Sequence, residues 1–264
     1  MPSWDSAQYL RFASERTQPS IDLVARIALD APKRVVDLGC GPGNSTAVVG
    51  RRWPNAQIAG VDNSAAMLAG ARRDFPQWTW RESDLTAWAE RAGQPDGETY
   101  DLIFSNAAFQ WVPAHGALLP RLFEAVAPGG ALAFQIPHSL EAPHQLCISD
   151  LAASAAWQRR FVRPPVSWHV EPPGFYYDAL APRAARIELW LTDYLHVLDG
   201  PEAIVEWHRG TGLRPFIDQL PDEAARAEFL RDYLATITPH YPRQADGRLL
   251  MPFRRMFCIA YCSP

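Results

Sequence analysis

The segment VVDLGCGPGNST, which covers residues 35–46, contains three glycines at alternate positions, Gly39, Gly41 and Gly43. An apolar run precedes them and helix-forming residues follow, so we predict a sharp turn from a buried strand into a helix. Glycine has no Cβ and adopts left-handed backbone angles easily, so such a turn lets backbone atoms come close to a ligand. The chain is thereby restricted to folds in which a strand leads into a helix beside a ligand site.

Predicted strands and helices alternate through the first half of the chain. Short apolar runs predict strands at 35–39, 57–62, 78–84, 100–106 and 129–137. Helical patterns lie between them at 44–53, 64–75 and 115–126. Strands joined by helices of about ten residues form βαβ units, which predicts an α/β fold with a parallel sheet.

The alternation ends at Pro137. Residues 138–182 combine short helical patches with paired prolines, and residues 185–198 alternate with the period of a strand. Two helices at 201–209 and 221–238 and a last strand at 249–261 follow. We expect one domain over 1–264, with a core at about 30–137, 183–198 and 249–262. The remaining segments, about 1–29, 138–182 and 199–248, are expected to form a helical lid and substrate elements.

Composition excludes several classes of partner. The net charge of −4 gives no general attraction to nucleic acid or to an anionic membrane. No segment reaches the roughly 18 apolar residues of a membrane-spanning helix, and the first residues lack the pattern of a signal peptide. The four cysteines form no CxxC pair, so we expect neither zinc nor disulfides. A cytoplasmic location is the resulting expectation.

The glycine turn does not match two common nucleotide-binding motifs. The dinucleotide pattern G-x-G-x-x-G that starts at Gly39 would need glycine at 44, where the chain has Asn44. The phosphate loop that ends in GK[ST] is also missing. The spacing is instead G-x-G-x-G, and an acid, Asp37, lies two residues before the first glycine.

This segment resembles the first motif of class I S-adenosylmethionine-dependent methyltransferases. The resemblance implies a Rossmann-like sheet, mostly parallel with a last antiparallel strand, and S-adenosyl-L-methionine as the cofactor. It places the backbone of Gly39 and Gly41 against the ligand, and Asp37 near the methionine end.

Acids that end the next two strands agree with this resemblance. Asp62 follows Gly43 by about the 20 residues expected of a βαβ unit, and an acid at this place binds ribose hydroxyls. In the family an acid at Asp84 accepts a hydrogen bond from the adenine amine. Both acids also fit a simple helix-capping role. The resemblance implies one set of cofactor-binding residues: Asp37, Gly39, Gly41, Asp62, Asn63, Asp84, Leu85 and Asn106.

A more specific resemblance extends over the whole chain. The segments SAQYLRFASERTQPSIDLVARI, NAAFQWVP, GFYYDAL, TGLRPFIDQL and RLLMPFRRMFCIAY are similar to those of trans-aconitate 2-methyltransferases. That family methylates a carboxylate of trans-aconitate and releases a monomethyl ester and S-adenosylhomocysteine. The resemblance implies a small tricarboxylic acid as substrate and gives no oligomeric state.

A carboxylate acceptor needs little from the protein. It is ionised at neutral pH, so we expect catalysis by positioning, with no catalytic base and no metal. Arginine is suited to hold the other carboxylates because its planar fork makes two parallel hydrogen bonds. The expected substrate-binding residues are Tyr9, Arg16, Gln110, Trp111, Tyr176, Tyr177, Arg214, and either Arg254 or Arg255.

Other functions fit parts of the pattern. A different small acid or a phenol-like compound is an alternative acceptor for the same chemistry. A nicotinamide-dependent dehydrogenase and a partner protein that binds the cofactor without catalysis are more distant alternatives.

Overall fold

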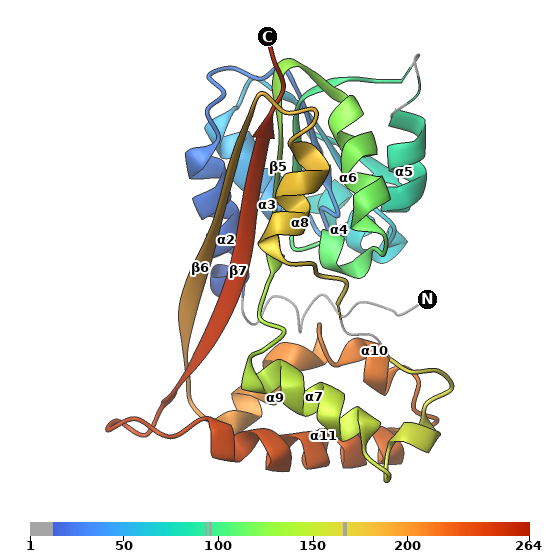
Figure 1. Cartoon of the computed structure of the whole chain (residues 1–264), viewed down its shortest axis with the longest axis vertical. Helices are drawn as coiled ribbons and strands as arrows, with labels where there is room; N and C mark the ends of the chain where they lie inside the picture. The colour runs from blue at the N-terminus through green and yellow to red at the C-terminus, as the bar shows by residue number, and fades with distance from the viewer. Residues whose placement is uncertain (1–12, 93, 95–96, 166–167) are drawn as a thin grey trace. The chain divides into compact units, whose positions relative to one another are not determined.

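The computed structural model describes residues 13–92, 94, 97–165 and 168–264, with the backbone alone for residues 13–16 (Figure 1). Tyr9 lies outside the described residues. The chain divides into two compact units. The sheet unit holds Ala13–Pro137, His169–Thr192 and Arg255–Pro264, and the helical unit holds His138–Trp168 and Asp193–Arg254.

Most of one seven-stranded sheet lies in the sheet unit, and the parts of its last two strands at 193–198 and 249–254 belong to the helical unit. The strands of this sheet are β1 (Arg34–Leu38), β2 (Gln57–Asp62), β3 (Thr79–Glu82), β4 (Tyr100–Asn106), β5 (Val126–Pro137), β6 (Arg186–Leu198) and β7 (Leu249–Tyr261). The order across the sheet is β3-β2-β1-β4-β5-β7-β6. Neighbours from β3 to β5 are parallel, and β7 is antiparallel to β5. The predicted mostly parallel sheet with a last antiparallel strand is confirmed.

Alternate residues of the buried strands face opposite sides of the sheet. Val36 and Ile103 belong to a core shared with α5 (Leu85–Ala92), α6 (His115–Glu124) and α8 (Pro173–Leu180). On the other side, Phe257 stacks on Trp190 with 4.8 Å between ring centroids. Arg26 of α2 (Ala13–Arg26) lies 4.4 Å over the same indole ring, so α2 covers this side.

The direction of α2 also follows from its contacts. Just after the helix, the backbone N–H of Ala28 donates to the Tyr261 hydroxyl at 2.9 Å. Tyr261 pairs with Ala131, near the beginning of the regular part of β5. An α-helix of 14 residues is about 21 Å long, so α2 begins toward the carboxyl ends of the parallel strands.

Two further helices connect the parallel strands. They are α3 (Asn44–Arg52) and α4 (Ala65–Asp74). Ser64 caps α4 by accepting a hydrogen bond from the Met67 N–H at 3.3 Å, as its position before the helical pattern predicts. Each connection returns the chain to the same end of the sheet, so the loops after β1, β2, β3 and β4 gather at one edge.

The helical unit consists mainly of α7 (Pro143–Ala153), α9 (Pro201–Arg209), α10 (Arg214–Ile217) and α11 (Glu223–Ile237). The α11 helix packs on α7 and α9. Asp222 caps α11, since its carboxylate accepts from the Ala225 N–H at 2.8 Å. Among the described residues, no helix is long and apolar enough to cross a membrane.

Candidate active site

The glycine turn between β1 and α3 is held tightly on one side and open on the other. Gly39 has a φ of 72°, and its N–H donates to the Val61 carbonyl at 2.7 Å. A Cβ on Gly39 would lie 2.1 Å from the Ala108 Cβ, so only glycine fits there. Gly41 has a φ of 53°, yet a Cβ on it would meet no described atom within 4 Å. Its backbone is therefore accessible to a ligand.

Asp37 ties this turn to the start of α3. One carboxylate oxygen, Oδ2, accepts from the Ser45 hydroxyl at 2.6 Å and from the Thr46 hydroxyl at 2.7 Å. The other, Oδ1, is buried without a hydrogen-bond partner among the described residues. Burial raises the pKa of Asp37 to about 6, although both hydroxyl bonds oppose the rise. A buried carboxylate oxygen that accepts no hydrogen bond from the described residues can accept one from a cationic group of a ligand.

The raised pKa of Asp37 predicts a pH-dependent stability in the ligand-free protein. Folding favours the protonated form, so this group's contribution to stability is fully present below about pH 4 and is lost as the pH rises from there through about 6. For a shift of about two units the loss is on the order of 3 kcal/mol. Urea unfolding should therefore show Asp37→Asn gaining about that much stability relative to wild type over this range. A difference that does not vary with pH contradicts the burial argument.

Asp62 organises the neighbouring loop at the end of β2. Its Oδ2 accepts from the Gly41 N–H at 2.9 Å, and its Oδ1 accepts from the Ser64 N–H at 2.9 Å. Burial raises the pKa of Asp62, and these backbone bonds lower it. A carboxylate has about four acceptor sites, so these bonds do not use its full capacity to accept from hydroxyl donors. Asn63, the next residue, is exposed.

Asp84 lies at the end of β3 and caps α5. Its Oδ1 accepts from the Thr86 N–H at 2.8 Å and from the Ala87 N–H at 3.2 Å. The capping role considered from sequence is thus present, and Asp84 is also exposed, which leaves its carboxylate accessible to a ligand. Leu85 is 9% exposed and packs in the core under α5.

The end of β4 carries a chain of polar side chains across the sheet. Gln135 of β5 donates through Nε2 to Asn106 Oδ1 at 2.6 Å. Arg255 of β7 donates through Nη1 to Gln135 Oε1 at 3.2 Å. Ala107 follows with a φ of 55°, an unfavourable value for a residue with a Cβ. Such strain tends to occur at functional sites.

Gln110 and Trp111 form the short helix η1 (Phe109–Trp111) just after this strained residue. Gln110 is 3% exposed, and its Nε2 donates to the Ala107 carbonyl at 2.7 Å. Its Oε1 is buried and has no hydrogen-bond partner in the described part of the chain. Trp111 is partly exposed. Both sequence candidates therefore lie at the same edge of the sheet as Asn106.

Tyr176 and Tyr177 point in different directions from α8. Tyr176 is fully buried, and its hydroxyl lies 2.9 Å from His115 Nδ1. His115 Nε2 lies 2.8 Å from the Phe109 carbonyl, so Tyr176 and His115 together hold η1 in place from its buried side. Tyr177 is 53% exposed and has the accessibility that a substrate contact needs.

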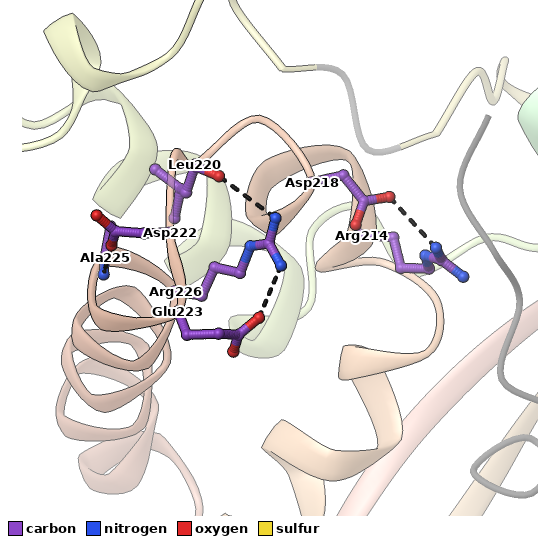
Figure 2. A network of polar contacts seen from close by, with 7 residues as sticks. All are labelled: Arg214, Asp218, Leu220, Asp222, Glu223, Ala225 and Arg226. Carbon is purple, nitrogen blue, oxygen red and sulfur yellow. Dashed lines mark hydrogen bonds and ion pairs between the residues drawn. The ribbon is translucent and has the colours of Figure 1, made fainter.

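The arginine candidates belong to different parts of the chain. Arg16 is in the first turns of α2, where the backbone alone is described. Arg214 and Arg254 belong to the helical unit. Arg214 pairs with Asp218 at 3.4 Å, separately from the Arg226 contacts with Glu223 and Leu220 (Figure 2). Arg254 makes two 2.8 Å bonds to Asp193.

The fold and this edge of the sheet define a class I methyltransferase. Residues 9–173 match the family model of a methyltransferase domain. The fold agrees with a Haemonchus contortus phosphoethanolamine N-methyltransferase solved with S-adenosyl-L-methionine, at a TM-score of 0.54 and 16% identity over 97% of this chain and 57% of that one. It also agrees with the YcgJ protein of Bacillus subtilis, at a TM-score of 0.56 and 13% identity over 94% of this chain and 99% of that one.

Sequence relatives narrow the class. A trans-aconitate 2-methyltransferase of Rhodopseudomonas palustris is 46% identical over 98% of this chain and 99% of its own length. One of Methylobacterium nodulans is 47% identical over 98% of each. The chain belongs to the trans-aconitate 2-methyltransferase family.

Several residues that build the site were not predicted from the sequence. Ser45 and Thr46 hold Asp37, and Gln135 links Asn106 to Arg255. A signal for Gln135 does exist, because it is the one polar residue in the apolar run ALAFQI of a strand buried on both faces. Ser45 and Thr46 follow the glycines as ordinary helix-starting residues, so their pattern gives no such signal.

Proposed function

We propose that this protein transfers a methyl group from S-adenosyl-L-methionine to a carboxylate of trans-aconitate, giving a monomethyl ester and S-adenosylhomocysteine. The observation that carries the cofactor assignment is the open backbone at Gly41 beside Asp62, the acid that ends β2. The acceptor assignment is supported by the names of relatives of nearly equal length.

The residues at this edge of the sheet fit the proposed cofactor in three places. Asp62 has acceptor sites left for the two ribose hydroxyls, and Asp84 with Leu85 lies at the next strand end for the adenine. Asp37 has a buried oxygen without a hydrogen-bond partner among the described residues, and we assign it to the methionine part. The N-cap of α3 is Gly43, which has no side chain to accept from the first N–H groups of the helix. Those N–H groups can therefore attract the cofactor's carboxylate.

The chemistry requires alignment more than acid–base catalysis. The cofactor supplies a methyl group on a positively charged sulfur; a C–O bond to the acceptor forms as the C–S bond breaks. The acceptor carboxylate is ionised at neutral pH, so no residue has to remove a proton. The protein's part is to hold one carboxylate oxygen in line with the methyl group at about 3 Å and to exclude water. Gln110 is the polar group that we assign to the acceptor in this alignment, and Asn106 is the residue that we expect beside the methionine part of the cofactor.

An acceptor screen tests the proposal. The protein is incubated with methyl-labelled S-adenosyl-L-methionine and a panel that contains trans-aconitate, other di- and tricarboxylic acids and phenols, and products are identified by mass spectrometry. We expect labelled trans-aconitate monomethyl ester as the main product. Binding of S-adenosylhomocysteine without any methylated product would contradict catalysis, and a preferred phenol would contradict the carboxylate assignment. Binding of a nicotinamide cofactor in place of S-adenosylhomocysteine would contradict the whole proposal.

A further inference from the structure

We propose that His115 and Tyr176 are positioning residues for methyl transfer. A one-way chain of hydrogen bonds through these two side chains holds η1 in place, and η1 carries Gln110, the residue assigned to the methyl acceptor. This inference rests on the proposed function and adds the groups that hold its alignment. It follows from the chemistry of the chain, from its burial and from the backbone that η1 supports.

The donors and acceptors allow only one direction for this chain. The Phe109 carbonyl can only accept, so the His115 Nε2 that lies 2.8 Å from it carries a proton. A neutral imidazole protonated at Nε2 accepts at Nδ1, and the Tyr176 hydroxyl donates to it at 2.9 Å. The Tyr176 oxygen accepts from the Glu171 N–H at 3.1 Å. The tautomer of His115 is therefore set by its neighbours.

Burial preserves this proton pattern at neutral pH. His115 is 3% exposed and Tyr176 is fully buried, where α6 and α8 lie side by side (Figure 1). Burial lowers the pKa of His115, although the carbonyls of Phe109 and Val112 and the charge of Glu171 favour its cation. Burial raises the pKa of Tyr176 to about 12, so the hydroxyl keeps its proton. Both side chains are therefore neutral, as the chain requires.

The chain ends on a segment that supports a strained turn. The helix η1 follows Ala107, whose φ of 55° is unfavourable for a residue with a Cβ. The Ala107 carbonyl accepts from Gln110 Nε2 at 2.7 Å, and the Gln110 carbonyl accepts from the His169 N–H at 2.8 Å. His115 holds Phe109, which lies between Ala107 and Gln110. The strained turn and the Gln110 amide thus both depend on where η1 lies.

Aromatic packing separates the role of the Tyr176 hydroxyl from that of its ring. The Phe109 ring lies 5.2 Å from the Phe134 ring, and the Phe134 ring lies 5.8 Å from the Tyr176 ring, between centroids. A phenylalanine at position 176 keeps these ring contacts and loses the hydroxyl alone. It leaves His115 Nδ1 without its donor, so Tyr176→Phe tests the hydrogen-bond chain with little change in packing.

The position of η1 determines where the loss should appear. It follows the carboxyl end of β4, whereas the acids assigned to the nucleoside lie at the ends of β2 and β3, beyond β1 in the sheet. Methyl transfer needs one carboxylate oxygen in line with the methyl group, and a misplacement of about 1 Å can cost about 100-fold in rate. Loosening of η1 should therefore slow the transfer and leave cofactor binding intact.

Single-turnover kinetics of variants test the inference. With saturating trans-aconitate and labelled S-adenosyl-L-methionine, Tyr176→Phe should slow methyl transfer about tenfold. His115→Leu should slow it about 100-fold, and His115→Gln should lie between, because its amide still donates to the Phe109 carbonyl. The double variant Tyr176→Phe/His115→Leu should be no slower than His115→Leu, since both changes break one chain.

Tyr100→Phe is the matched control. Tyr100 is also buried, and its hydroxyl donates to Glu98 at 2.6 Å near the start of β4, at the other end of the strand from η1. This variant should transfer the methyl group at the wild-type rate although it too loses a hydrogen bond. Binding of S-adenosylhomocysteine, measured by calorimetry, should be unchanged in every variant, which also verifies their folding.

The tautomer of His115 gives a readout that is independent of activity. In protein prepared with ¹⁵N-labelled histidine, the His115 signals are those that are absent from His115→Gln. At neutral pH they should show a protonated Nε2 and an unprotonated Nδ1, and Tyr176→Phe should shift the Nδ1 signal. A proton on Nδ1 overturns the chain whether or not the protein transfers a methyl group.

The outcomes separate this inference from the proposed function. A Tyr176→Phe protein with a wild-type transfer rate, or one whose main loss is in affinity for S-adenosylhomocysteine, overturns the inference while the proposed function stands. A wild type that does not methylate trans-aconitate overturns the proposed function, and the tautomer measurement still judges the chain. If His115→Leu fails to fold, the rates of Tyr176→Phe and Tyr100→Phe decide.

Discussion

Replacement of Gly39 by alanine should destabilise the protein by about 4 kcal/mol and abolish cofactor binding. The new Cβ would lie 2.1 Å from the Ala108 Cβ, and the φ of 72° is unfavourable for any residue other than glycine. Left-handed strain contributes about 1–2 kcal/mol, and overpacking of a buried position adds about 1–3 kcal/mol. For a chain of this size such a loss lowers Tm by roughly 10 °C.

Gly41→Ala is the matched comparison for Gly39→Ala. Gly41 also has a left-handed φ, of 53°, but a Cβ there meets no described atom within 4 Å. We expect a stability loss of about 1 kcal/mol from strain alone. Because the space beside Gly41 is assigned to the cofactor, the affinity for S-adenosylhomocysteine should still fall by about tenfold or more. Thermal denaturation and calorimetry measure the two effects, and a stable Gly41→Ala protein with unchanged affinity would place the cofactor elsewhere.

Substitution of Asp62 by alanine should reduce the affinity for S-adenosylhomocysteine by about 100-fold or more. The variant loses two charge-assisted bonds to the ribose hydroxyls, each worth about 1.5–3 kcal/mol when the acceptor is charged. It also frees the Gly41 N–H that Oδ2 holds at 2.9 Å, so the glycine turn loses support. Asp62→Asn keeps the size of the side chain but exchanges one acceptor for a donor, so it should cause a smaller loss, of about tenfold.

Asp84→Asn serves as the graded control for Asp62. Asp84 is exposed, and an asparagine there keeps an acceptor for the helix cap. Loss of the charge alone should therefore reduce the affinity for S-adenosylhomocysteine about fivefold. The order Asp62→Ala, Asp62→Asn, Asp84→Asn by decreasing effect is the expected result in calorimetry. Equal effects for Asp62→Ala and Asp84→Asn would contradict a ribose contact at Asp62.

Much of the fold could be predicted because the strands of this sheet are short, apolar and bounded by glycine, proline or acids. All seven predicted strands are present, and only their ends differ by a few residues. Helices at α2 and α7 were less clear. The α2 helix contains Pro19 within its length, which removes a helix hydrogen bond and weakens the pattern. The α7 segment lies in the proline-containing stretch after β5.

The candidate site could be predicted only where residue type and strand end coincide. Asp37 lies near the end of a predicted strand, and Asp62 and Asp84 are the last residues of the next two, so topology alone places them at one edge of the sheet. Arg255 and Gln135 depend on the pairing of β7 with β5 and on which face each side chain occupies. A shift of one residue in that pairing would exchange Arg254 for Arg255, and the sequence contains no signal that sets the register.

Tyr176 illustrates a different limit. Its segment, GFYYDAL, suggests two tyrosines of equal standing, and helical geometry turns one of them inward to His115. The buried tyrosine then supports η1 from behind, while Tyr177 stays exposed. Which of two adjacent residues faces the core depends on the position of α8 against α6, which is a tertiary property.

A crystal structure with both S-adenosylhomocysteine and trans-aconitate tests the central claim most directly. The account predicts the ribose hydroxyls within hydrogen-bond distance of the Asp62 carboxylate and the adenine amine beside Asp84. It also predicts one acceptor carboxylate facing the sulfur. A structure in which the nucleoside lies away from Gly41 and Asp62, or in which trans-aconitate occupies a site far from Asn106 and Gln110, would contradict it.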